Sequence, residues 1–120
     1  MKIAVTSSGT DLEAPLDPRF GRAAYFIVVD PDNSNFEVVE NQQNLDRPPG
    51  AGIQAGTRVA ETGAEVLITG HCGPKAFRVL QAAGVRIVTG ADGSVREVVS
   101  RFQDGKLQTA AQADVEGHWV

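Results

Sequence analysis

The sequence of 120 residues contains a single cysteine, Cys72, and this scarcity excludes several classes of protein. One thiol cannot form an intramolecular disulfide, and it cannot build a four-cysteine zinc or iron-sulfur cage within one chain. Long apolar runs are also absent, because nowhere do 18 apolar residues follow one another and the first apolar stretch is too short for a signal peptide. These absences predict a protein of the reducing cytoplasm without a membrane anchor.

Basic residues are the minority among the charged ones. The sequence has 11 Lys and Arg against 15 Asp and Glu, which gives a formal net charge of -4. A general nucleic-acid binder needs a basic face to displace counterions, so the overall charge argues against that class but leaves a local cationic pocket open. With 42% hydrophobic residues, the composition predicts one globular domain. We expect this domain to span residues 1–110 and residues 111–120 to form a flexible tail.

Short β-branched runs separated by turn residues predict the first strands. Residues 2–7 form a short β-branched run that Ser8 and Gly9 stop, which indicates a buried strand followed by a loop. Residues 25–30 and 36–41 flank a turn rich in Pro, Asp and Asn, and this pattern predicts a β-hairpin. The long segments 8–23 and 42–52 predict functional loops, the second of them mobile, because most connections in compact domains have about 4–6 residues.

The middle of the sequence predicts helices that alternate with strands. A helix over residues 52–62 is weakly driven, because Gly56 lowers its helix propensity. Strands over residues 65–70 and 85–90 flank a helix that starts at Pro74, and such a βαβ unit has parallel strands. The predicted apolar faces of the two helices are Ile53, Val59 and Ala60, and Phe77, Leu80 and Ala83.

A capping box predicts the start of the last helix, because Ser94 is followed three positions later by Glu97. Residues 106–110 then predict a short edge strand. Together the elements predict an α/β fold, a three-layer α/β/α sandwich around a mixed sheet of about five strands, with the hairpin as its antiparallel member. The apolar face of the last helix comprises Val95, Val98, Val99 and Phe102.

Three loops that contain glycine follow the parallel strands and are expected to meet at one edge of the sheet. Glycine lets a ligand approach the backbone, and N–H groups at a helix start favour negative charge, so these loops predict a cradle for an anion. The alternative is that the glycines only turn corners. The candidate residues in these loops are Ser7, Ser8, Gly9, Thr10, Gly70, Gly73, Pro74 and Gly90.

Four cations lie close to these loops in the sequence. A guanidinium group beside backbone donors holds a multiply charged anion better than either does alone. The alternatives are ordinary ion pairs with nearby carboxylates for the first two cations, and a solvated helix face for Arg78. The candidate residues are Arg19 and Arg22, with Phe20 and Gly21 between them, and Lys75 and Arg78.

His71 and Cys72 are the only adjacent soft metal ligands in the sequence. Two donors cannot close a zinc site, but they could add one or two bonds to a cofactor that brings its own sulfur. The alternative is a small buried cysteine beside a histidine in a turn. The sequence lacks a P-loop, a dinucleotide-binding glycine motif, a well-placed base for Cys72 and the clustered carboxylates of a two-metal nuclease. It therefore favours binding over catalysis.

The chain resembles the dinitrogenase iron-molybdenum cofactor accessory family over about residues 1–110. The motifs that carry the resemblance are KIAVTSSG, LDPRFGRAAYFIVVD, GAGIQAG, GAEVLITGHCGPKAFRVLQAAGV and GSVREVVSRFQDGKL, in this order. The family includes cofactor carriers of nitrogenase assembly and the small molybdenum-copper orange protein of sulfate reducers, which this chain resembles in length. The resemblance implies a ribonuclease H-like fold without the nuclease carboxylates.

For function, the resemblance implies a protein that is not an enzyme and that binds, carries or stores a preformed anionic metal-sulfur cluster. The cluster would contain molybdenum, with copper or iron. A histidine ligand is expected in the loop that holds His71, and its neighbour Cys72 leaves the ligand set open. We expect a monomer that binds neither nucleic acid nor membrane and that has protein partners in cluster delivery. The alternative is a regulatory or assembly protein that binds another protein such as an ATPase.

Overall fold

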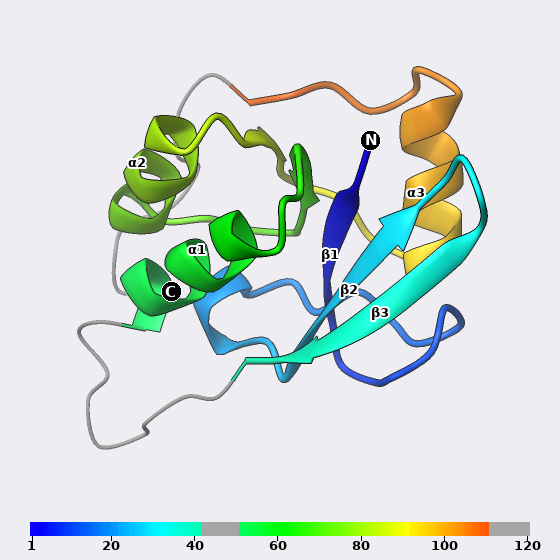
Figure 1. Ribbon diagram of the computed structural model, residues 1–120, viewed down its shortest axis with the longest axis horizontal. Coiled ribbons are helices and arrows are strands. Elements are labelled where there is room, and N and C mark those ends of the chain that lie inside the picture. Colours follow the sequence, from blue (N-terminus) through cyan, green and yellow to red (C-terminus); the bar gives the residue numbers. More distant parts are fainter. Residues whose placement is uncertain (42–50, 111–120) are drawn as a thin grey trace.

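The structure is a computed structural model that describes residues 1–41 and 51–110. Within these ranges the chain forms one mixed sheet of five strands in the order β3-β2-β1-β4-β5 (Figure 1). β1, β4 and β5 are parallel neighbours, and β2 runs antiparallel to both β1 and β3. The predicted α/β class and mixed sheet are therefore confirmed. The strands are β1 (Ile3–Ser7), β2 (Tyr25–Asp30), β3 (Asn35–Glu40), β4 (Val66–Ile68) and β5 (Arg86–Val88).

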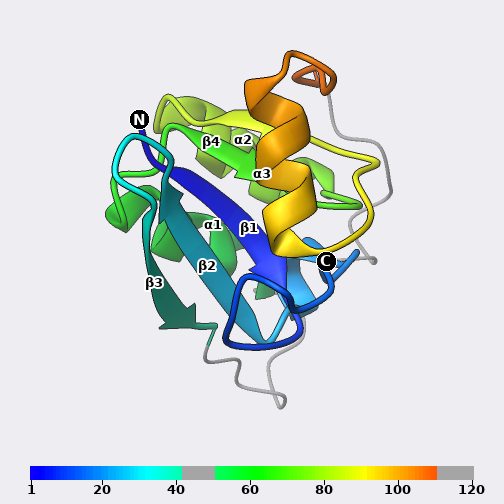
Figure 2. The same ribbon diagram turned by 90° about the vertical axis from the view of Figure 1, so that its right-hand side faces the viewer.

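Three α-helices and one short 3-10 helix accompany the sheet in the described part of the chain. α1 and α2 lie on one face of the sheet and α3 lies on the other (Figures 1 and 2). None of these helices is long and apolar enough to cross a membrane. The predicted tail and most of the predicted mobile loop fall outside the described residues. The helices are η1 (Phe20–Arg22), α1 (Ala51–Glu61), α2 (Pro74–Ala82) and α3 (Val95–Gln103).

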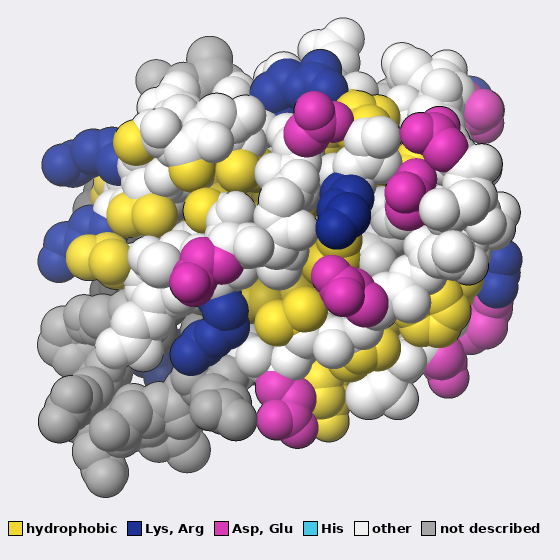
Figure 3. Space-filling model, viewed as in Figure 1, with side chains coloured by type: hydrophobic (Ala, Val, Ile, Leu, Met, Phe, Trp, Pro, Cys, Tyr) yellow, Lys and Arg dark blue, Asp and Glu magenta, His cyan; other side chains and the backbone are white. Residues whose placement is uncertain are grey.

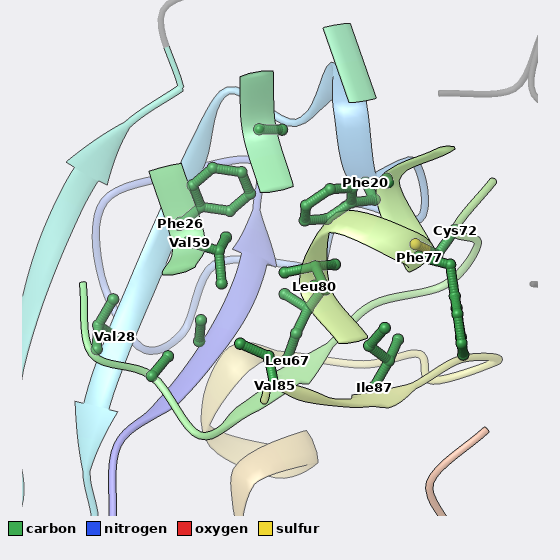
Figure 4. Packing of buried hydrophobic residues seen from close by; sticks show 14 residues of the cluster. Phe20, Phe26, Val28, Val59, Leu67, Cys72, Phe77, Leu80, Val85 and Ile87 are labelled. Carbon is green, nitrogen blue, oxygen red and sulfur yellow. The ribbon is translucent and has the colours of Figure 1, made fainter. Parts of the chain in front are cut away.

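The sheet separates two apolar clusters, because the side chains of its central strands alternate between the faces. On one face, residues of β1, β2, β4 and β5 meet α1, α2 and η1. The rings of Phe20 and Phe26 lie in this cluster with their centroids 5.6 Å apart (Figure 4). On the other face, the first loop and α3 cover the sheet with Leu16, Val95 and Val98. All five residues of β1 are buried, which explains why its first three residues are apolar in succession.

The buried face of α1 differs from the predicted stripe. Ile53 is 42% exposed, whereas Val59 is buried as predicted and Ala60 is only partly buried. The reason is the contact with α2: a Cβ atom built at Gly56 would lie 3.1 Å from Cγ1 of Val79. The glycine that weakens the isolated helix therefore lets α1 and α2 approach closely. The buried positions of α1 are Gly52, Ala55, Gly56 and Val59.

The predicted ends of α2 are correct, but one residue of its predicted apolar face is wrong. Pro74 occupies the first turn, and Gly84 follows the helix with a φ of +81°. Ala83 is exposed, because it is the C-cap residue and lies beyond the last helical turn. Its expected place on the apolar face is taken by Ala76, which is fully buried. Phe77 and Leu80 are buried as predicted.

The capping box of α3 is confirmed. The Ser94 hydroxyl accepts from the N–H of Glu97 at 3.1 Å, and the N–H of Ser94 donates to a Glu97 carboxylate oxygen at 3.0 Å. The predicted edge strand over residues 106–110 is wrong. The N–H of Ala110 donates to the carbonyl oxygen of Ile87 at 2.6 Å, but no ladder forms, because Leu107 packs against the α3 side of the core.

We expect the contribution of Glu97 to stability to disappear in acid. The pKa of its carboxyl is lowered in the folded protein, first by the Ser94 backbone N–H, then by the Ser94 hydroxyl and the nearby Arg101. A carboxyl whose pKa is lowered by folding stabilises the fold when the pH is above its ordinary pKa of 4.5. This stabilisation is lost as the pH falls through the pKa of the folded protein. The urea midpoint of the wild type should differ most from that of Glu97→Gln at about pH 7, and the two midpoints should converge at about pH 3. A difference that stays constant with pH would contradict this role.

Candidate functional site

The first loop crosses the carboxyl ends of the parallel strands and joins them into one rim. We use "rim" for this edge of the sheet with residues 8–23, 69–75 and 89–97, which include the first turns of α2 and α3. Isolated β-bridges link Ser7 with Leu16, Pro15 with Ser94, and Arg19 with His71. Figure 2 shows the loop turning below the end of β1 beside the start of α3. The predicted convergence of the three loops is thus present in the structure.

Two buried threonines hold the first loop against the sheet. The hydroxyl of Thr6 lies 2.6 Å from the carbonyl oxygen of Asp17, to which it donates, and 3.0 Å from the hydroxyl of Thr69. The N–H of Asp17 in turn donates to the carbonyl oxygen of Thr6 at 3.0 Å. The sequence did not lead us to predict this pair. Its signal was that three apolar residues precede a threonine both in β1 and at the end of β4, and that these two segments pair in register.

The glycines of the rim serve contacts within the chain. A Cβ atom at Gly70 would lie 2.7 Å from both the Cα and the carbonyl oxygen of Pro18, and one at Gly9 would lie 2.9 Å from the Cβ of Ala14. Several backbone donors expected to face a ligand are also used internally. The N–H of His71 donates to the Pro18 carbonyl at 2.7 Å, and that of Gly90 donates to the Gly70 carbonyl at 2.7 Å. Close contacts and backbone hydrogen bonds within the chain therefore hold these loops in place.

One half of the rim is acidic. A surface pocket of about 430 Å³ lies between the first loop and the start of α3, and its lining includes Glu13, Asp92 and Glu97. Two arginines of α3 neutralise these three carboxylates only in part: Arg96 pairs with Glu13, and Arg101 lies 3.7 Å from Asp92 and 3.6 Å from Glu97. Such a half is unsuited to a polyanion, because the like charges of the carboxylates repel it.

The other half of the rim is cationic. Arg22 is partly buried at the end of η1, and Lys75 is exposed in the first turn of α2. No ion pair within the described residues involves Arg22, Lys75 or Arg78, whereas Arg19 lies 4.0 Å from Asp17. Figure 3 shows Lys and Arg side chains along the outer edge of α2. This half of the rim therefore carries positive charge that no described carboxylate neutralises.

The start of α2 adds to this positive field. Gly73 is the N-cap residue, and it makes no side-chain capping bond. Helix N-termini carry partial positive charge on their first-turn N–H groups, and no side chain of the described residues is seen to cap those of α2. Arg22, Lys75 and this helix end are the features that an anion would meet.

The two candidate metal ligands lie in different environments. His71 is partly buried, and its backbone is held by the segment of Pro18 and Phe20: the N–H of Phe20 donates to the His71 carbonyl oxygen at 3.2 Å. Cys72 is completely buried, and its thiol lies 3.7 Å from the carbonyl oxygen of Gly73. Figure 4 shows Cys72 among the buried side chains with Phe77. Within residues 1–41 and 51–110, no group of three or more His, Cys, Asp and Glu residues could hold a metal ion.

The remaining candidate residues are divided between core and surface. The Phe20 ring lies in the core, and Gly21 is buried beside it. The Ser7 hydroxyl is buried and bonds to the carbonyl oxygen of Gly9 at 2.9 Å. Only some of these remaining residues can therefore touch a ligand directly. Those that are exposed or partly exposed are Ser8, Gly9, Thr10, Pro74 and Gly90.

A model of the family described as dinitrogenase iron-molybdenum cofactor matches residues 1–105. The chain belongs to this iron-molybdenum cofactor family. The predicted family is thereby confirmed, and the matched residues include both halves of the rim.

Two solved structures and one further protein are similar to this chain. The apo form of the orange protein from Desulfovibrio gigas is 43% identical, with a TM-score of 0.87 over 95% of this chain and 96% of that one. A Thermotoga protein of the DUF35 family, solved by NMR, is 33% identical, with a TM-score of 0.78 over 96% and 97% of the two chains. An uncharacterised protein from Methanocaldococcus jannaschii is 30% identical over 78% of this chain and 80% of its own length.

Proposed function

We propose that this member of the iron-molybdenum cofactor family binds a preformed anionic metal-sulfur cluster and carries or stores it without catalysing a reaction. The observation that carries the proposal is the bridge between Arg19 and His71, which holds η1 with Arg22 beside the loop that leads into the first turn of α2 with Lys75. A metal-sulfur cluster that contains molybdenum, with copper or iron, is a compact polyanion. Guanidinium, ammonium and backbone N–H groups can hold such an anion without many covalent ligands.

The metal-ligating side chains of the described residues are too few to build a metal site, but they suit a cluster that is assembled before it binds. A protein-built metal cage needs several ligands that converge, and the described part of the chain has no such group. A cluster brings its own sulfide ligands, so one or two protein donors are enough. His71 lies on the rim and is our candidate for direct bonding to a metal of the cluster. We assign the buried thiol of Cys72 to the core.

The fold and the setting are part of the same proposal. We take residues 1–110 as one cluster-binding domain, with helices on the two sheet faces as the outer layers of a ribonuclease H-like α/β/α sandwich. The described residues contain no group of three or more His, Cys, Asp and Glu residues that could hold a metal ion, which supports a binding protein over a nuclease of that fold. We propose that the domain acts as a monomer in the cytoplasm and that a partner protein receives the cluster.

Anaerobic addition of tetrathiomolybdate and copper(I) to the apo protein tests the proposed function. We expect new visible absorption at a fixed stoichiometry, together with amide shifts in η1, the loop of residues 70–75 and the start of α2. Bovine serum albumin treated in the same way serves as the control for nonspecific adsorption. Absorption that matches the albumin control, without localised amide shifts, would refute the proposal.

The ligand assignment predicts opposite results for two neighbouring substitutions. His71→Ala should weaken cluster binding about tenfold and change the urea midpoint little, because its imidazole is only partly buried. Cys72→Ala should leave the absorption spectrum unchanged and lower stability by about 1 kcal/mol, because it removes a buried sulfur from the core. Loss of the absorption band in Cys72→Ala, with the fold intact, would instead make the thiol a ligand.

A second candidate function, the binding of another protein, is favoured by the edge strand β3. Phe36 and Val38 are 42% and 37% exposed on this strand, and one edge of β3 has no partner strand in the described sheet. Exposed apolar residues on an open edge are typical of protein contacts. Isolation of a stoichiometric protein partner, combined with no response to cluster components, would favour a regulatory or assembly role over cluster carriage.

A further inference from the structure

We infer that Asn41 and Arg58 form a polar clamp that positions η1, and with it Arg22, for anion binding. The part of this inference that concerns binding rests on the proposed function. Neither residue belongs to the rim, and neither has a sequence motif that indicates a role. Their role follows from the hydrogen bonds that they share with η1.

Asn41 follows β3 directly and is only 6% exposed. Its side-chain amide donates to the carbonyl oxygen of Ala23 at 2.8 Å and to that of Gly21 at 3.3 Å. Its backbone N–H donates to the carbonyl oxygen of Ala24 at 3.0 Å. One residue thus binds three carbonyl groups in and just after η1.

Arg58 fixes the other end of the Asn41 side chain. Its Nη1 donates to Oδ1 of Asn41 at 2.9 Å from the middle of α1, and the arginine is partly buried. The amide is therefore bonded through both its nitrogen and its oxygen, which leaves it one orientation. Through this chain of bonds, β3 and α1 both determine where η1 lies.

η1 needs such support because it is only three residues long. Its N-cap residue, Arg19, makes no side-chain capping bond, and a single 3-10 turn has little stability of its own. Gly21 and Ala23 are buried, so their carbonyl groups would lose their side-chain donor without Asn41. Arg22 lies between these two residues. A change in the clamp should therefore move the Arg22 guanidinium group more than it moves the sheet.

The test compares Asn41→Asp with Asn33→Asp in the full chain. The first change places carboxylate oxygens against the carbonyls of η1, whereas the second makes the same chemical change at an exposed residue of the β2–β3 turn. We expect hydrogen exchange at the Arg22 amide to rise about tenfold in Asn41→Asp, with β1 amides little changed, and no change in Asn33→Asp. Unaltered exchange at Arg22, or a uniform rise throughout the sheet, would overturn the clamp.

Binding of tetrathiomolybdate with copper(I) separates the two proposals. If the wild type binds this probe, Asn41→Asp should weaken binding about tenfold, and unchanged affinity with a loosened η1 would overturn the positioning role alone. If the wild type does not bind, the proposed function fails, while the exchange result still decides whether the clamp exists. Arg58→Gln removes the charge-assisted bond but keeps Asn41. We expect it to produce the same changes to a smaller degree, so it keeps the test decisive should Asn41→Asp fail to fold.

Discussion

Gly70→Ala should detach the first loop from the sheet and lower the free energy of unfolding by about 3 kcal/mol. The new methyl group would lie 2.7 Å from the Cα and the carbonyl oxygen of Pro18. These are backbone atoms, so no flexible side chain can rotate away. Movement of Pro18 would also break the 2.7 Å bond from the His71 N–H to its carbonyl oxygen. A single methyl group thus disrupts the contact that holds both loops.

Gly105→Ala is the matched control for this prediction. It has a φ of +76° and no atom within 4 Å of an added Cβ, so the substitution costs only the left-handed strain of about 1 kcal/mol. Urea unfolding of both variants isolates the effect of the clash, and amide shifts at Pro18 neighbours locate it. Equal destabilisation of the two variants would show that Gly70 does not act through close approach.

Charge reversal at Arg22 and Lys75 together should weaken cluster binding by about 100-fold or more. Each substitution with glutamate replaces attraction by repulsion beside a polyanion, which is worth about tenfold per site even in a well-solvated setting. Neither side chain takes part in an ion pair within the described residues, so the fold should survive. Titration with tetrathiomolybdate and copper(I) measures the loss.

The control for the charge reversal is the double variant Lys2→Glu and Lys106→Glu. It changes the net charge by the same amount at two exposed lysines outside the rim. We expect it to retain nearly full affinity, and added salt should weaken wild-type binding more than that of the Arg22 and Lys75 variant. If both double variants lose affinity equally, the protein responds to net charge and not to a site.

Local signals explain which parts of the fold the sequence predicts. The continuous apolar runs, the turn residues of the hairpin and the capping box of Ser94 and Glu97 act between neighbours in the chain. The parallel arrangement also follows from the βαβ order, and it correctly brings three loops together. By contrast, the buried face of α1 depends on Val79 of α2, so Ile53 was misplaced. Such contacts between distant segments have no local pattern.

For the candidate site, too, the sequence shows what depends on local pattern and topology and does not show contacts between distant segments. It indicates the cations and loops of the rim, because residue type and topology place them. It does not show that Glu13, Asp92 and Glu97 line one pocket, or that Gly70 faces Pro18 in place of a ligand. Asn41 carries no signal beyond its position after a strand, because its partners are backbone carbonyls of η1 and a side chain of α1.

The bridges across the rim join segments that lie far apart in the sequence. Pro15 meets Ser94, and Arg19 meets His71, across long stretches of intervening chain, so these contacts must wait until the parallel strands have aligned. The β2–β3 hairpin needs no such wait, because its strands are neighbours in the sequence. We therefore expect the rim to form late and to open before the sheet does. A partly unfolded molecule would then keep its sheet while the three loops of the rim had already separated.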